Sequence, residues 1–241
     1  MEKDLVSIGE AAEILGVHID TLRRWDESGR LPAIRKSPGG SRYYHPRDLE
    51  LFSGNLYRLA YDWISGQSPI EIPSTFYCGN NAVFQTRLIK MQNALGEISE
   101  IKDIFPLVVA VAGEIGNNSF DHNLGKWPDV NGIFFAYDVG KREIILADRG
   151  LGILETLKRV RPSLSTDEEA LKVAFTEVIS GRSPESRGNG LKFVRSVVAE
   201  NLISLSFQSG NSELEIKKSS ADLNLKDSKE KIRGCIALIK F

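Results

Sequence analysis

One segment constrains this chain more than any other. Residues 101–123, IKDIFPLVVAVAGEIGNNSFDHN, combine an apolar pattern with polar residues at helical spacing. Successive residues of an α-helix are about 100° apart, so Glu114, Asn118, Asp121 and His122 fall within an arc of roughly 100°. The apolar residues of the adjoining arc are Ile104, Val108, Val111 and Ile115. The segment therefore predicts a helix that packs one face on a sheet and presents a carboxylate, an amide and an imidazole beside it.

The polar face of this helix carries groups suited to phosphate chemistry. An asparagine with oxygen ligands nearby suits Mg²⁺, which usually keeps several waters and binds phosphate oxygens. A carboxylate one turn earlier, Glu114, is placed to position or deprotonate an attacking water. We therefore predict Asn118 as a magnesium ligand and Glu114 as the catalytic residue.

Two further motifs follow along the chain. In ILADRGLGI a predicted strand ends at Asp148 and is followed by Gly150 and Gly152. A carboxylate at a strand end can accept from an exocyclic amine such as that of adenine, and glycines allow close approach of a ligand. In residues 186–191, SRGNGL, a glycine-rich backbone opens a predicted helix, and such a helix start is an anion-binding site.

The remaining pattern from residue 70 onward mixes strands and helices. Strands are predicted at 70–78, 132–140, 142–150, 202–210 and 234–241. Helices are predicted at 82–96, 167–181 and 189–201. The polar stretch 211–233 is predicted to be an exposed hairpin or mobile loop.

The first fifty residues differ from the rest in their residue pattern and in their local charge. SIGEAAEILGVHIDTLRRWDESGRL predicts two short helices around a tight turn, and Pro38-Gly39-Gly40 predicts a turn between two extended arms. Between Ile19 and Arg47 the chain has seven Lys/Arg and three Asp/Glu, although the formal net charge of the whole chain is −1. A nucleic-acid surface must therefore come from local charge, and this region supplies it.

This region resembles the MerR-type and excisionase-type winged helix-turn-helix. The resemblance lies in IGEAAEILGVHIDTLRRWDESGRL followed by GGSRYYHPRDL and covers about the first 52 residues. It implies that the second helix and the wing contact double-stranded DNA. Carried onto this sequence, the implied contacts are Thr21, Arg23, Arg24, Arg35, Arg42 and Tyr44.

The three later motifs, in this order, resemble the N, G1 and G2 boxes of the GHKL superfamily of gyrase-type ATPases, Hsp90 chaperones, histidine kinases and MutL. The resemblance spans roughly residues 70–241 and implies an α/β sandwich, a mixed sheet with helices on one face and ATP between them. It implies Mg²⁺ at Asn118, a lid from about Ile153 to Arg187, and adenine against Asp148 and Gly152. The complete set of implied nucleotide-binding residues is Asn118, Asp121, His122, Asp148, Gly150, Gly152, Arg187, Gly188, Asn189 and Gly190. Cys235 departs from the pattern, because many relatives carry threonine after the glycine of the last strand.

The expected architecture is thus α+β. It has a winged helix-turn-helix over residues 1–52, a connecting helix over 53–69 and a GHKL-like domain over 70–241. The start of the chain lacks an apolar core of signal-peptide length and no apolar stretch is long enough to span a bilayer, so we expect a cytoplasmic protein without a membrane partner.

We expect an ATP-binding, DNA-binding regulator, with slow hydrolysis at most and with ATP and Mg²⁺ as cofactors. Two alternatives stay open at this stage. One is a serine/threonine or histidine-type kinase that acts on a partner protein, and the other is an interaction module without nucleotide. A protein partner and a homodimer are both compatible with the sequence.

Overall fold

The computed structural model describes residues 5–15, 17–27, 31–46, 48–49, 56–70, 72–178 and 190–241. The chain divides into two compact units, residues 1–59 with 72–76 and residues 60–71 with 77–241. Each unit is described by itself. Together they are α+β, with helices and antiparallel sheets. None of the described helices is long and apolar enough to cross a membrane.

The first unit, called the head below, is a helix-turn-helix with a small sheet. Its elements are β1 (Val6–Ser7), α1 (Ile8–Leu15), α2 (Ile19–Glu27), β2 (Ile34–Arg35) and β3 (Arg42–Tyr44). β3 pairs antiparallel with both β1 and β2. The two helices bury Ala11, Ala12 and Leu22 against Leu31, Tyr44 and Leu49. The predicted helix-turn-helix and the wing arms at β2 and β3 are confirmed, and β1 adds a third strand that the pattern did not indicate.

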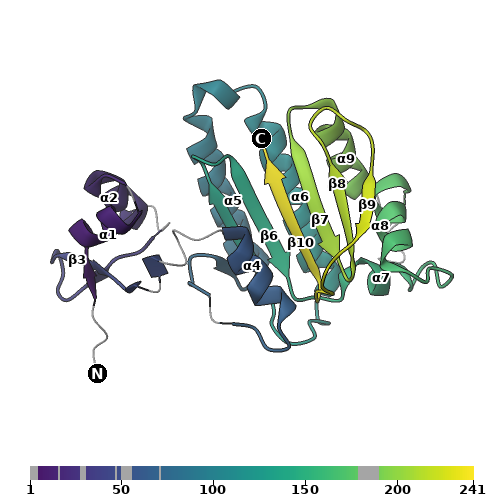
Figure 1. Cartoon of the computed structure of the whole chain (residues 1–241), viewed down its shortest axis with the longest axis horizontal. Helices are drawn as coiled ribbons and strands as arrows, with labels where there is room; N and C mark the ends of the chain where they lie inside the picture. Colours follow the sequence, from purple (N-terminus) through teal and green to yellow (C-terminus); the bar gives the residue numbers. More distant parts are fainter. Residues whose placement is uncertain are drawn as a thin grey trace. The chain divides into compact units, whose positions relative to one another are not determined.

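The second unit contains a seven-stranded sheet. Its strands are β4 (Tyr77–Cys78), β5 (Ile133–Asp138), β6 (Glu143–Asp148), β7 (Ser204–Ser209), β8 (Ser212–Ile216), β9 (Asn224–Asp227) and β10 (Cys235–Lys240). They lie in the order β4-β5-β6-β10-β7-β8-β9, so the last strand runs between β6 and β7 (Figure 1). Every described pair is antiparallel, so the expectation of a mixed sheet is wrong. Short connections explain three of these pairs, because β5–β6, β7–β8 and β8–β9 are hairpins.

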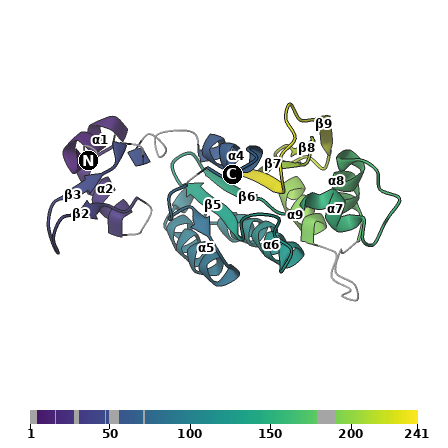
Figure 2. The same cartoon turned by 90° about the horizontal axis from the view of Figure 1, so that it is seen from below.

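The helices of the second unit cover the sheet. They are α4 (Leu56–Ser65), α5 (Asn81–Gly96), α6 (Phe105–Asn123), α7 (Gly152–Leu157), α8 (Asp167–Thr176) and α9 (Gly190–Glu200), with a 3₁₀ turn at Ser99–Ile101. α5, α6, α8 and α9 lie on one face (Figure 2) and share one apolar core with alternate residues of the strands. The amino end of α5 is capped by Asn80, whose side chain accepts from the N–H of Val83, and α8 begins with a capping box of Thr166 and Glu169.

The opposite face of the sheet is covered as well. From Ala60 onward α4 belongs to the second unit, and the Trp63 ring, 2% exposed, lies 6.4 Å between centroids from the ring of Phe134 on β5. Phe134 alternates along the strand with Ile133 and Phe135, which face the α5–α6 side. The prediction of a sandwich with helices on one face only is therefore wrong. The first four residues of β5 are all buried, so both faces of this strand are covered.

Several predicted boundaries change, and α8, for example, ends at Thr176 rather than at 181. Among the described residues of the strand expected over 70–78, Tyr77–Cys78 pair with β5, and residues 74–76 form a turn after Pro73. The long helix begins at Phe105 rather than at 101, with Pro106 in its first turn. The stretch 211–233 is a hairpin of β8 and β9, but Leu214 and Ile216 of β8 are buried in the core rather than exposed.

Candidate functional site

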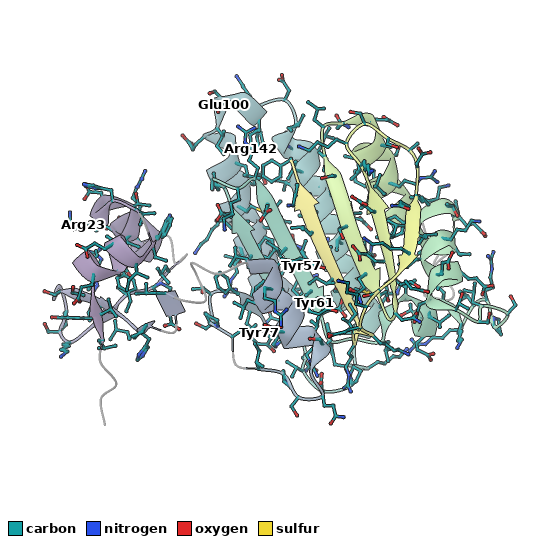
Figure 3. All side chains as sticks on the ribbon, in the orientation of Figure 1. Arg23, Tyr57, Tyr61, Tyr77, Glu100 and Arg142 are labelled. Carbon is teal, nitrogen blue, oxygen red and sulfur yellow. The ribbon has the colours of Figure 1, made fainter. Side chains whose placement is uncertain are left out.

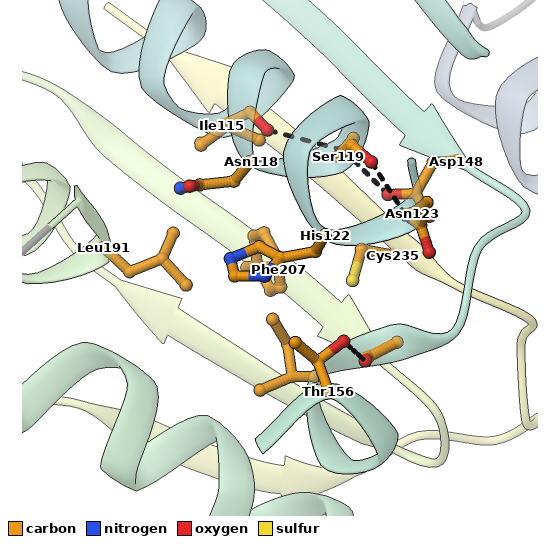
Figure 4. Close-up of a pocket in the computed structure, with 12 residues that line it drawn as sticks. Ile115, Asn118, Ser119, His122, Asn123, Asp148, Thr156, Leu191, Phe207 and Cys235 are labelled. Atoms are coloured by element: carbon orange, nitrogen blue, oxygen red, sulfur yellow. Dashed lines mark hydrogen bonds between the residues drawn. The ribbon is translucent and has the colours of Figure 1, made fainter. Parts of the chain in front are cut away.

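A cavity opens on one side of α6, between this helix and the sheet (Figure 4). It encloses about 400 Å³ of space not filled by atoms, its mouth included. The space inside it that can hold water-sized molecules is about 40 Å³, well below the usual volume of a small-molecule site. Its walls come from α6, the end of β6, α7, the start of α9 and the strands β7 and β10. The lining residues are Ile115, Asn118, Ser119, His122, Asn123, Asp148, Gly152, Ile153, Thr156, Leu191, Phe207 and Cys235.

Asp148 is the buried acid of this cavity. It ends β6, opposite Ile133 of β5 and Cys235 of β10, and is 2% exposed. The Ser119 hydroxyl donates to its Oδ2 at 2.8 Å and the Gly150 N–H donates to its Oδ1 at 2.8 Å. Burial raises the pKa of the Asp148 carboxyl from 3.8 to about 6, while hydrogen bonds from Ser119 and from the backbone of Gly150 and Cys235 act in the opposite direction. The carboxylate is therefore fixed in place, mostly ionised near neutral pH, and short of water.

The turn after Asp148 needs its glycines. Gly152 has φ +77°, and a Cβ on it would lie 3.1 Å from Ser209 Oγ. Gly150 has no room either, because a Cβ would lie 2.2 Å from the Asn123 side chain. Asn123, 4% exposed, accepts from the Leu151 N–H at 2.8 Å and donates to the Ser119 carbonyl at 2.8 Å. The turn is thus packed against α6 by an asparagine that the sequence analysis did not single out.

The polar face of α6 meets the start of α9. Asn118 Nδ2 donates to Glu114 Oε1 at 3.3 Å. A Cβ on Gly190 would lie 1.8 Å from Glu114 Oε1 and 3.1 Å from Asn118 Nδ2. Glu114 and Asn118, one turn apart on α6, therefore lie beside Gly190, which is far from them in the sequence. Asp121 is exposed and does not line the cavity, whereas His122 does.

The phosphate-binding segment is described only in part. Arg187, Gly188 and Asn189 lie outside the described residues, and Gly190 is the first residue of α9. Within the range expected for a lid, 153–187, the structure has most of α7 and the whole of α8, whose residues Ala170 and Val173 pack against Leu157 and Leu164. Among the described residues no three His, Cys, Asp or Glu side chains gather in a way that would hold a metal ion.

Two residues beside Asp148 were missed or uncertain from sequence. Ser119 was missed because a serine inside a helix carries no distinctive signal and because it lies about 100° around α6 from Asn118. Cys235, partly buried, lines the cavity. Burial and the nearby Asp148 carboxylate raise its pKa well above the ordinary thiol value, so it is present as a thiol.

In the head, α2 presents two cationic side chains. Arg23 and Arg24 are exposed, and Arg23 (Figure 3) forms an ion pair with Asp20 at 2.7 Å. Arg24 Nη2 donates to Thr21 Oγ1 at 3.4 Å, which is a weak contact. Three of the residues predicted to contact DNA, Thr21, Arg23 and Arg24, therefore share one stretch of α2.

The wing arginines are engaged within the head. Asp26 Oδ2 accepts from Arg35 Nη2 at 2.5 Å and from Arg42 Nε at 2.6 Å, and Asp26 Oδ1 accepts from the Ala33 N–H at 2.9 Å. Burial by itself would raise the pKa of Asp26, but these hydrogen bonds outweigh burial and the pKa is below 3.8. The ion pairs thus tie the wing to the end of α2.

Tyr44 does not lie where a DNA contact requires it. It was expected on the outer surface of the wing, but its side chain belongs to the core of the head and is 1% exposed. The reason is strand alternation, because Tyr43 and Tyr44 on β3 point to opposite sides and the second one is covered by the helices.

Comparison with known proteins identifies the head. Residues 7–44 match the family model of the MerR family regulatory protein, so this stretch is a MerR-family helix-turn-helix domain of the DNA-binding type. A segment of 63 residues, 26% of this chain, is 36% identical to the Type II methyltransferase M.Eco47II of Escherichia coli. The match covers 15% of that protein's length.

Proposed function

We propose that this chain is a DNA-binding regulator whose second unit binds ATP with Mg²⁺, and that the bound nucleotide changes how the head binds DNA or a protein partner. The head supplies the DNA-binding function of its family. The proposal for the second unit rests on one observation above all: Asp148, a buried carboxylate, and Asn118, a helix amide, line the same cavity.

The chemistry of Asp148 favours adenine. Its carboxylate accepts from Ser119 through Oδ2 and from Gly150 through Oδ1, and the backbone of Cys235 also donates to it. A carboxylate has about four acceptor positions, so it can accept from one further donor. Adenine carries an exocyclic amine that donates, whereas guanine carries a carbonyl oxygen at the corresponding position that only accepts. A guanine oxygen would face a carboxylate oxygen without a proton between them. Asp148 therefore selects ATP over GTP in this proposal.

The residues around Asn118 fit a magnesium ion that is shared with phosphates. Mg²⁺ prefers oxygen ligands and in nucleotide sites takes few of them from the protein. Asn118 offers an amide oxygen, and Glu114, 3.3 Å away from its Nδ2, offers a carboxylate that can order or deprotonate water. When bound, the ion would neutralise phosphate charge. Gly190 leaves room beside both side chains, because a Cβ there would occupy that space. These features support a GHKL-type nucleotide site, with slow hydrolysis the most that Glu114 alone would give.

The test is calorimetric titration of the full chain with ATP and Mg²⁺. We expect binding to native protein, at least about tenfold weaker binding to Asn118→Ala, and binding of ATP but not GTP. Asn93→Ala, which removes an exposed asparagine from α5, is the matched control and should bind like the native protein. Absence of binding to the native protein, together with an unchanged melting temperature in excess MgATP, would refute the proposal, because a ligand of the native state must stabilise it.

A second measurement separates regulation from catalysis. Fluorescence anisotropy with a labelled DNA duplex, with and without MgATP, should show a nucleotide-dependent affinity. Equal affinity in both conditions, in a protein that binds nucleotide by calorimetry, would refute the regulatory part. Transfer of the γ-phosphate to a protein would show kinase activity instead.

A further inference from the structure

The residue after Asp148 is an arginine that is completely buried. Arg149 has 0% exposure, and its guanidinium is fully engaged. Nη1 donates to the carbonyl of Trp63 at 2.6 Å, and Nη2 donates to the carbonyls of Gly66 at 3.0 Å and Gln67 at 3.1 Å. Nε and Nη2 also donate to Asp129 Oδ2 at 2.9 Å and 2.7 Å. One side chain therefore joins the end of β6 to the end of α4.

One of the three carbonyls that Arg149 binds belongs to the last turn of α4, and the other two belong to the residues that follow this helix. The last four carbonyls of an α-helix have no partner within it, and a cation at that end is favourable. Trp63 lies in the last turn of α4, and Gly66 and Gln67 follow it directly. Because the guanidinium is taken out of water, Arg149 is compatible with the fold only when these acceptors are in place.

Arg149 also belongs to the turn that separates two cavities. Asp148 and Gly152 line the cavity of the candidate site. Gly150, Leu151 and Gly152 line a second cavity together with Ser65, Gly66 and Gln67 from the end of α4. On the α6 side Asn123 holds the turn through Leu151, and on the α4 side Arg149 holds it. Arg149 follows Asp148 directly in the chain. A ligand that fixes the position of Asp148 therefore also restricts the position of Arg149.

We propose that Arg149 is the positioning residue through which nucleotide bound at Asp148 orders the carboxyl-terminal end of α4. This inference rests on the proposed nucleotide site. A boundary between the two compact units falls within α4, between Leu59 and Ala60, so the helix that Arg149 holds is one of the places where the chain passes from the head into the second unit. The proposed coupling is a difference in the order of the end of α4 between the nucleotide-bound and the nucleotide-free states. It requires no new contact in the head.

The experiment is hydrogen–deuterium exchange on the full chain, with and without Mg²⁺ and a non-hydrolysable ATP analogue. Two peptides report, 115–123 for the cavity wall on α6 and 60–70 for the end of α4. In the native protein the analogue should slow exchange about fivefold or more in both. In Arg149→Lys the protection of 115–123 should remain, while the analogue-dependent protection of 60–70 is lost.

The variants distinguish coupling from a purely structural role. If Arg149 only supports the fold, Arg149→Lys should speed the exchange of peptide 60–70 equally with and without the analogue. The ratio of the exchange rates in the two conditions would then match that of the native protein, and this result overturns the inference. Asp129→Asn leaves the arginine in place but removes the charge that it binds, and serves where Arg149→Lys fails to fold. It should reduce the ratio for 60–70 about threefold, and an unchanged ratio overturns the inference.

The control and the fallback are both within the chain. Arg195→Lys alters an arginine that also donates to a backbone carbonyl, that of Ala221, but is exposed and remote from the turn, so both peptides should behave as in the native protein. If the native protein shows no protection of 115–123, the nucleotide proposal itself fails. Protection of 115–123 without protection of 60–70 in the native protein refutes the Arg149 inference alone.

Discussion

Replacing Asp148 by asparagine should stabilise the second unit at neutral pH while weakening its affinity for ATP. Burial raises the pKa of this carboxyl from 3.8 to about 6, so the folded chain binds the proton more tightly than the unfolded chain does. A pKa change of one is worth 1.36 kcal/mol, and the cost of keeping Asp148 ionised in the fold is therefore about 3 kcal/mol at pH 7. Asparagine keeps the shape and avoids that cost. Its amide needs hydrogen-bond partners of its own, so we expect a net gain on the order of 1–2 kcal/mol.

The pH dependence follows from the direction of this shift. Between pH 3.8 and about 6 the folded state holds more protons at Asp148 than the unfolded state does, so the free energy of unfolding falls as pH rises through that window. Below it the carboxyl is protonated in both states and the cost disappears. The variant does not titrate at this position. Its stability relative to the native protein should therefore rise from pH 4.5 to pH 6.5 and be constant above that.

Urea denaturation at several pH values, followed by circular dichroism, measures this difference directly. Asp222→Asn, which removes an exposed carboxyl, controls for the loss of one negative charge. All other titrations are common to the variants and the native protein and cancel in the difference. A variant that is less stable than the native protein by the same amount at every pH would refute the reasoning, because it would show that Asp148 stabilises the fold through its hydrogen bonds and is not held ionised at a cost.

Three further outcomes test other parts of the structure. Gly234→Ala should destabilise the protein by about 3 kcal/mol or more in urea denaturation, because φ is +71° and a Cβ would lie 2.1 Å from a backbone oxygen. Gly125→Ala, where φ is +69° and the space is open, should cost only about 1–2 kcal/mol. Equal costs for the two variants would contradict the close approach at Gly234. Tyr44→Phe should leave the melting temperature of the head unchanged or raise it, because the buried hydroxyl has no hydrogen-bond partner among the described residues; a marked loss would show that a partner exists. Arg24→Ala should reduce the salt dependence of DNA binding, measured by anisotropy, by about one counterion. Arg42→Ala breaks ion pairs within the head and should mainly lower the melting temperature. The reverse pattern would mean that Arg42 contacts DNA and that Arg24 stabilises the head.

Local patterns in the sequence predicted the elements more reliably than their arrangement. The apolar and polar faces of α6 were correctly predicted, because helical periodicity alone determines which residues share a face. The hairpin of β5 and β6 was also predicted, since a short turn joins two buried runs. The place of β10 between β6 and β7 was not, because strand order depends on contacts between distant segments that no local pattern records.

The candidate site was predicted where a residue's role depends on spacing and missed where it depends on packing. Asn118 and Asp148 stand at the positions expected from their motifs and line one cavity. Ser119 and Asn123, which hold Asp148 and the glycine turn, are ordinary polar residues of a helix in sequence terms. Tyr44 was predicted to contact DNA because the family resemblance implies that the wing does so, and only the fold shows which side of β3 is covered.

Asp26 in the head and Asp148 in the second unit have contrasting environments. Asp26 in the head is held by two arginines, its pKa is lowered, and it contributes stability that is lost only in acid. Asp148 has neutral donors around it, a hydroxyl and backbone N–H groups, and its pKa is raised. A buried carboxylate that destabilises the chain in which it sits is retained most readily where a ligand compensates for it. Asp26 is thus bound by cations within the head, whereas Asp148 depends on neutral donors, and the next residue in the chain, Arg149, donates to the end of α4.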